Sequence, residues 1–390
     1  MTDPTTMFDI DGTTIFLGLT GSHAYGMARP DSDVDIRGVC IPPRTIRESH
    51  YYSFNQWTPE EQTGNWGARS QAAIDKLSEH PTAGECYQLT NRKADLVIYS
   101  LHKFVSLCAV NNPSFLEILF LPDGAVLFAA PQWEVLREQR QTFLTKEARH
   151  RYVGYAMGQL KRIETHRNWL LHPPKRAPKR GDFGLPEESV LPADVRNQID
   201  EAVNKIIRDW GVEDGLENYL DGSVQDVLRD RMTQFQAAVL RCEVTLLDEK
   251  LYTLAGASIG LSKDVLHVIK QERKYRSARK NWQQYQKWQT DRNEARAELE
   301  AKYGFDTKHA SHLIRLLRTG LELMTDNQLR VFRGDAEELM AIRKGAMTFD
   351  ELMETANGLQ DQIRGAAKEN TFPTEPDRDA IDKLLFSILD

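Results

Sequence analysis

Two aspartates separated by a single residue are the part of the sequence best suited to chemistry. Asp33 and Asp35 alternate with the apolar Val34 and Ile36. Strand alternation places both carboxylates on one face and both apolar side chains in the core. Like charges at neighbouring positions of one face repel each other, and a divalent cation between them relieves that repulsion. Magnesium is the natural candidate because it prefers hard oxygen ligands. The alternative is a solvated edge strand whose acids bind nothing.

A glycine–serine step about ten residues earlier suits a phosphate group. At Gly21 the backbone can approach a phosphate closely, and the hydroxyl and amide of Ser22 can donate hydrogen bonds to its oxygens. His23 and Tyr25 lie just past this step. They are candidates for nucleotide contacts, although a packed aromatic ring and a hydrogen-bonded core histidine explain them equally well.

The elements that must position these residues form a short α/β segment followed by a long helical one. Strands are expected at 13–19, 34–41 and 94–100, where apolar and β-branched side chains cluster between turn residues. Residues 44–93 have weak periodicity and are expected to form an irregular insertion or lid. From residue 101 onward the pattern is helical, and a loop rich in proline, glycine, lysine and arginine is expected at 173–184. The later helices are expected at 133–170, 194–210, 224–254, 262–302, 307–324, 335–343 and 348–364.

The stretch GSHAYGMARPDSDVDIRGV, residues 21–39, resembles the nucleotidyltransferase signature of the DNA polymerase beta superfamily, in which an Asp-x-Asp strand follows a Gly-Ser turn. That signature includes a third carboxylate on a later strand. Asp95 matches it, with Asp75 and Glu85 as alternatives. More narrowly, the stretch resembles the nucleotidyltransferases linked to RNA repair, also called RNA ligase-associated polymerases. Two further blocks, 102–120 and 303–324, fit that family.

The resemblance implies a reaction that uses two Mg²⁺ ions, or Mn²⁺ in their place. Asp33 and Asp35 would hold the ion bound to the triphosphate of ATP or another nucleotide. Together with Asp95 they would hold a second ion that acidifies the attacking hydroxyl. Pyrophosphate would leave through an in-line transition state stabilised by the charge of the metal ions.

A later helix carries basic side chains that could meet the triphosphate. In the segment DTKHASHLIRLLRTG, the residues Lys308, His312 and Arg315 form a polar stripe, and His309 lies beside it. The resemblance favours binding of the triphosphate over a solvated basic face. A zinc site at the two histidines would need a third ligand, and none is evident nearby in the sequence.

Two basic segments interrupt an otherwise acidic chain. Residues 161–180 and 273–288 combine lysine and arginine, and in 273–288 these alternate with tyrosine and tryptophan. Cations for phosphates beside aromatic rings for base stacking are typical of a track for single-stranded nucleic acid. A charged solvent face over a core of aromatic rings is the alternative. With a net charge of -7, any nucleic acid must bind to such a local surface.

No apolar signal core and no stretch long enough to cross a bilayer are evident, so a soluble, cytoplasmic protein without a membrane partner is expected. The four cysteines form no CxxC pair, which favours free thiols over a zinc or disulfide framework.

These features together predict an α+β protein with a small mixed-sheet catalytic domain at 1–125 and a helical domain at 126–390 that closes the active-site cleft. The expected activity is metal-dependent transfer of NMP or dNMP from a nucleoside triphosphate to a hydroxyl, with template-independent addition to, or synthesis of, RNA or single-stranded DNA favoured. Nucleotidylation of a protein or tRNA, and synthesis of a signalling oligonucleotide, are the enzymatic alternatives. An inactive binding partner that retains the fold is the non-enzymatic one. The oligomeric state is left open.

Overall fold

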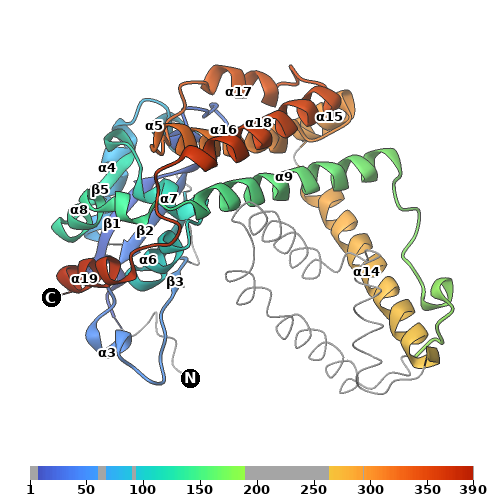
Figure 1. The fold of residues 1–390 in the computed structure, drawn as a ribbon, viewed down its shortest axis with the longest axis horizontal. Helices are drawn as coiled ribbons and strands as arrows, with labels where there is room; N and C mark the ends of the chain where they lie inside the picture. Colours follow the sequence, from blue (N-terminus) through green and yellow to red (C-terminus); the bar gives the residue numbers. More distant parts are fainter. Residues whose placement is uncertain (1–7, 60–66, 90–93, 189–262, 293, 390) are drawn as a thin grey trace. The chain divides into compact units, whose positions relative to one another are not determined.

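The computed structural model describes residues 8–59, 67–89, 94–188, 263–292 and 294–389 (Figure 1). The chain divides into two compact units. Residues 1–167 and 298–390 form the first unit, and residues 168–297 form the second unit. The first unit therefore includes residues on both sides of position 125. Helix α8, Pro131–Glu138, packs against β1 and β5, and α19, Arg378–Leu389, packs against α8.

A small mixed sheet of five strands lies in the first unit, in the order β3-β4-β2-β1-β5. Strand β2 pairs in parallel with β4, and every other neighbouring pair is antiparallel. The predicted α+β class and its three strands are therefore confirmed, and β3 and β5 are additional. The strands are β1 Thr14–Leu19, β2 Asp35–Cys40, β3 Gln56–Trp57, β4 Asp95–Ser100 and β5 Val126–Ala129.

The central strands differ in which faces they bury. Every residue of β1 is buried, as expected for a strand that is covered on both faces. At the start of β2 the pattern alternates: Val34 and Ile36 are buried, whereas Asp35 and Arg37 are half-buried on the opposite face. The predicted alternation is confirmed, and it presents the polar face of β2 to one side of the sheet.

Two helices occupy the segment that was expected to be irregular. Helix α4, Ala68–Glu79, packs against β1 and β5, and α5, Ala83–Leu89, packs against α4. The prediction for 44–93 was therefore wrong over this part. The buried face of α4 includes Ser70 and Ala73 beside Ile74 and Leu77, and its small residues hide the helical period from a search for large apolar side chains.

The remaining N-terminal helices are short and have recognisable starts. Helix α6, Leu101–Ala109, is capped by the Ser100 hydroxyl, and α7, Pro113–Leu119, begins with proline after an Asn112 cap. Both starts agree with the sequence. Three single-turn helices complete this part of the fold: α1 Ile10–Thr13, α2 Gly21–Ala24 and α3 Arg44–Arg47.

The C-terminal helices of the first unit gather around α16, Thr307–Asp326, which packs against α17, Ala336–Arg343, and α18, Phe349–Glu369 (Figure 1). Helix α16 buries one continuous apolar face, including Leu313, Ile314 and Leu317. Further described helices are α8 Pro131–Glu138, α9 Glu147–Leu171, α15 Glu294–Tyr303 and α19 Arg378–Leu389, the last of which was not predicted.

In the second unit, α14, Lys263–Asp291, packs against the 3₁₀ turn η4, Arg180–Phe183. The helix expected at 262–302 is thus two helices, α14 and α15. The helices expected at 194–210 and 224–254 lie outside the described residues. Within the part of the chain that the structure describes, no helix is both long enough and apolar enough to cross a bilayer.

Candidate active site

The sheet topology brings the predicted carboxylates together. Asp35 and Asp95 are register partners at the amino ends of the parallel strands β2 and β4, and Asp33 precedes Asp35 by one alternation. Burial raises the pKa of Asp35, and the charges of Asp95 and Asp33 raise it further, against the opposing effects of Arg37 and Lys308. The fold therefore concentrates negative charge at this edge of the sheet.

Arg37 is a residue of this site that was not singled out from the sequence. Its Nη2 lies 2.9 Å from Asp95 Oδ2 and 3.6 Å from Asp35 Oδ1, and its Nη1 donates to the Asp95 carbonyl at 2.6 Å. It follows Asp35 by two residues and shares its face of β2, so the same alternation that identified the aspartates could have identified it. One guanidinium balances only part of the charge of these acids.

The residue before the glycine–serine turn is hydrogen-bonded to Asp35, the first residue of β2. Strand β1 is antiparallel to β2, so its end lies beside the start of β2. The Thr20 amide donates to the Asp35 carbonyl at 2.8 Å. Gly21 has φ +64°, and a Cβ at this position would lie 2.4 Å from Asp35 Oδ2. Glycine is therefore required both by the backbone conformation and by the closeness of the carboxylate. Ser22 follows it in α2 and is half-buried.

His23 and Tyr25, the candidates just past the glycine–serine step, take different positions. His23 is buried, and its burial, assisted by the charge of His80, lowers its pKa, while the backbone of Asp33 acts in the opposite direction. The imidazole is therefore neutral near pH 7. Tyr25 donates its hydroxyl to Glu117 Oε2 at 2.6 Å, and its ring lies 3.8 Å from the Arg315 guanidinium.

Arg315 lies inside the protein rather than on a solvent-facing stripe. It is 5% exposed and donates from Nη1 to Glu117 Oε1 at 2.7 Å. Burial disfavours its charged form, but Glu117 and Tyr25 more than offset this and raise its pKa. The pair joins α16 to α7, and Glu117, like Arg37, has no counterpart among the residues singled out from the sequence.

The other basic candidates of α16 differ in charge. Lys308 is near enough to the acids to lower the pKa of Asp35. Burial, together with the positive charges of Arg315 and Lys308, lowers the pKa of His312 to about 3. His312 is therefore neutral at physiological pH and can offer a hydrogen bond, but no charge, to a phosphate. His309 lies beside Asp306 at the start of the helix.

A pocket of about 190 Å³ opens beside the carboxylates. Pockets for whole small molecules are typically about 300–1,000 Å³, so this one has room for part of a nucleotide. Of the predicted residues, Gly21, Tyr25 and Asp35 line it, and the remaining candidates do not. The other lining residues are Thr20, Ala24, Arg37, Tyr99, Ser114, Phe115, Glu117, Ile118, Leu121 and Val331.

The basic segments predicted to bind nucleic acid meet largely within the second unit. Arg180 pairs with Glu272, and Phe183 contacts the ring of Tyr275, so η4 and α14 present one surface. Arg276, Arg279 and Lys280 of α14 are exposed.

Other members of these segments serve packing. In the first unit, Arg167 lies 4.7 Å over the ring of Phe349. In the second unit, Tyr285 is buried against Trp169, Trp282 and Trp288. The aromatic rings are therefore partly core, and only part of each segment is available to a strand.

Comparison with known proteins bears on the part of the chain that carries these acids. Residues 7–171 match the RNA repair pathway DNA polymerase beta family. Over 365 residues the chain is 24% identical to an uncharacterized 38.9 kDa protein in the nrdC-mobD intergenic region of Enterobacteria phage T4, and the match covers 91% of this chain and 90% of the phage protein. No solved structure matches the chain significantly. The family match includes the blocks at 21–39 and 102–120, and the block at 303–324 lies outside it.

Proposed function

We propose that this chain transfers a nucleoside monophosphate from a nucleoside triphosphate to a hydroxyl group, because residues 7–171 match the RNA repair pathway DNA polymerase beta family. Pyrophosphate is the leaving group. The observation that carries this proposal is the convergence of Asp33, Asp35 and Asp95 beside the Gly21 turn.

The residues at this place fit a divalent metal ion. They supply carboxylate oxygens, which are the hard ligands that Mg²⁺ prefers. Burial raises the pKa of Asp35 most, and the charges of Asp95 and Asp33 add a repulsion of the kind that a cation relieves. When bound, two Mg²⁺ ions would supply positive charge to the attacking and leaving oxygens of an in-line displacement. Asp33 and Asp35 would hold one ion, and these residues together with Asp95 would hold the other.

The surrounding side chains would bind and orient the triphosphate. Gly21 lets the Asp35 carboxylate lie close to the backbone of the turn, and Ser22 offers donors to phosphate oxygens. Lys308, whose charge already acts on Asp35, would neutralise part of the triphosphate. Arg37 would hold the Asp35 and Asp95 carboxylates in place between the two strands. Tyr25 and Arg315 would shape the pocket through their contacts with Glu117. His312 would be a neutral neighbour of the triphosphate, and His309 would lie beside it at the start of α16.

The acceptor we propose is the 3′-hydroxyl of RNA or single-stranded DNA, extended without a template. Its support is the exposed cations Arg276, Arg279 and Lys280 on α14, a helix that also carries Trp282 and Trp288. Basic side chains for the backbone and aromatic rings for the bases are the two requirements of sequence-tolerant binding to a single strand.

Incubation of the protein with each labelled NTP and dNTP in Mg²⁺, with and without an RNA or DNA oligonucleotide, tests the proposal directly. We expect Mg²⁺-dependent labelling of the oligonucleotide and release of pyrophosphate, with no product from Asp35→Asn. Asp31→Asn is the matched control, because Asp31 is an exposed acid of the same loop that pairs with Arg29. Labelling of the protein itself or of tRNA would redirect the choice of acceptor. Equal turnover by Asp35→Asn and wild type would refute the site.

A further inference from the structure

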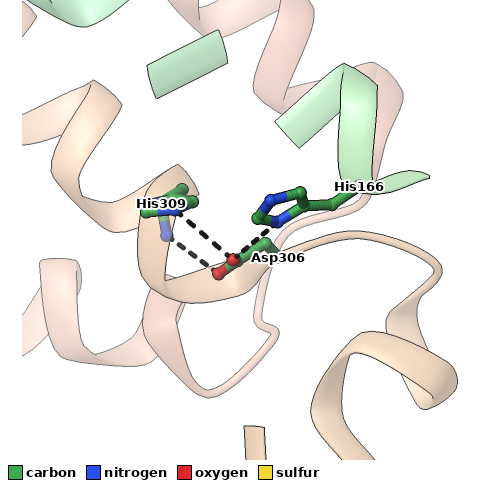
Figure 2. Close-up of side chains that lie close together, drawn as sticks. All are labelled: His166, Asp306 and His309. Atoms are coloured by element: carbon green, nitrogen blue, oxygen red, sulfur yellow. Dashed lines mark hydrogen bonds and ion pairs between the residues drawn. The ribbon is translucent and has the colours of Figure 1, made fainter. Parts of the chain in front are cut away.

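A second group of metal-ligand side chains lies in the first unit, at the meeting point of α9 and α16. His166 belongs to α9, Asp306 caps the start of α16, and His309 lies in its first turn. Figure 2 shows both imidazoles directed at the carboxylate of Asp306. A carboxylate oxygen and one ring nitrogen from each histidine all lie within 4.8 Å of one another.

The distances in this group are longer than hydrogen bonds and close to those of atoms that share a cation. His166 Nδ1 lies 3.5 Å from Asp306 Oδ2, and His309 Nε2 lies 3.7 Å from the same oxygen. A hydrogen bond between these atoms would be about 2.7–3.2 Å long. Two ligand atoms that are each about 2.0–2.1 Å from a tetrahedral zinc ion lie roughly 3.3 Å apart. Small rotations of the two imidazoles would therefore complete a metal site.

The surroundings favour a fixed site over a chance encounter of surface groups. Asp306 is fully buried, and its Oδ1 accepts the backbone amide of His309 at 3.1 Å, which orients the carboxylate. His166 and His309 are partly buried, with side-chain exposures of 16% and 15%. A carboxylate held by a second hydrogen bond, with two imidazoles facing its other oxygen, is the arrangement in which metal ligands are usually supported.

We propose that His166, Asp306 and His309 bind one zinc ion, with the fourth coordination position open to water. Two imidazoles and one carboxylate are a ligand set for zinc or a similar transition metal, whereas Mg²⁺ prefers oxygen ligands alone. The ion would join α9 to the first turn of α16, the helix that also carries Lys308. The proposal stands independently of the proposed nucleotidyl transfer.

Metal titration of the full-length protein tests the assignment. After removal of metals with a chelator, CoCl₂ is added in the presence of excess Mg²⁺, which occupies oxygen-only sites, and the visible absorption of the complex is recorded. We expect one equivalent of Co²⁺ with the intense absorption of a nitrogen-containing, low-coordinate site, displaced by one equivalent of ZnCl₂. His166→Ala and His309→Ala should each weaken binding by about 100-fold or more, since loss of an outer partner alone costs about 10- to 100-fold.

His172→Ala is the matched control, because His172 follows α9 immediately and is exposed. It should bind Co²⁺ as wild type does. Circular dichroism verifies that each variant is folded. Addition of ZnCl₂ should raise the melting temperature of wild type and not that of His309→Ala. Wild-type protein that gains no such absorption overturns the proposal whether or not the variants fold, as does a site that survives both histidine substitutions.

Discussion

Two charged groups that each contribute side chains to the same pocket differ in how their charges are balanced. In the first group, Asp35 and Asp95 share the guanidinium of Arg37, and the nearby charge of Asp33 adds to the repulsion on Asp35. In the second group, the carboxylate of Glu117 receives one hydrogen bond from Arg315 and one from Tyr25, and all three groups are largely shielded from water.

The difference separates a group that is stable as it stands from one that is suited to a ligand. A buried carboxylate with a guanidinium and a hydroxyl donor has its charge compensated, and disrupting it leaves an unpaired charge in a low-dielectric interior. In a cluster with more carboxylates than cations, the fold keeps like charges close to one another, and a bound cation lowers the energy of their repulsion. Loss of one charged side chain should therefore impair activity in the first group and stability in the second.

The largest expected effect is on activity, from Asp35→Asn. The substitution keeps the shape of the side chain and removes one metal-ligating charge, so turnover should fall at least about 1,000-fold, or about 4 kcal/mol of transition-state stabilisation. The melting temperature should stay the same or rise, because repulsion within the cluster is reduced. Initial rates of pyrophosphate release and a thermal melt measure the two quantities. A clear fall in melting temperature would show that the acids are structural, against the comparison.

Arg315→Met should produce the opposite result. It leaves Glu117 buried without its guanidinium, and we expect a loss of about 3–5 kcal/mol in the free energy of unfolding. Chemical denaturation followed by circular dichroism measures this loss. The double variant Glu117→Gln/Arg315→Met should recover part of it, because no unpaired charge then remains. If the single and double variants are equally unstable, the pairing of charges is not the source of the stability.

Tyr25→Phe should cost less, about 1–2 kcal/mol, because it removes one hydrogen bond to a charged acceptor and leaves the ring in place beneath Arg315. The same denaturation experiment applies. Tyr51→Phe is the control, since Tyr51 is 81% exposed and its hydroxyl is in contact with solvent. Equal stability of the two variants would show that the Tyr25 hydroxyl adds nothing to the Glu117 pair.

The smallest effect is on the pH dependence of stability in the absence of metal. The fold raises the pKa of Asp35 above its ordinary value of 3.8, mainly through burial. As pH rises from 3.8 through the raised value, the unfolded chain loses this proton first, so the folded state is progressively disfavoured. Wild type should therefore lose stability relative to Asp35→Asn across this window, as measured by melts at a series of pH values. A constant difference between the two proteins would argue against the raised pKa.

The features that were predicted from the sequence are those encoded over a few residues. Alternation along 33–37 identified the strand and its acids, and the family resemblance added Asp95, which the register places beside Asp35. Arg37 obeys the same alternation and was missed because the search was for acids. The helices α4 and α5 were missed because small side chains cover much of their buried faces.

Features that depend on distant segments could not be predicted in this way. Glu117 gains its significance only when α7 meets α16, and His166 approaches Asp306 only through the fold. A third zinc ligand near His309 and His312 was not identified from the sequence, although Asp306 precedes His309 by only three residues. The burial of Arg315 and the neutrality of His312 likewise follow from packing that a helical stripe does not reveal.

The first unit is interrupted by residues 168–297, and its chain resumes close to the point where it is interrupted. Arg167 donates to the Gly304 carbonyl at 2.8 Å, so the chain departs from this unit and rejoins it at nearly the same point. Residues 168–297 are therefore an insertion in the first unit, and the two ends of the insertion lie close together. An insertion of a different length or fold could therefore replace this one at the junction without a change in the sheet, which lets the inserted unit vary while the acids of the first unit stay in place.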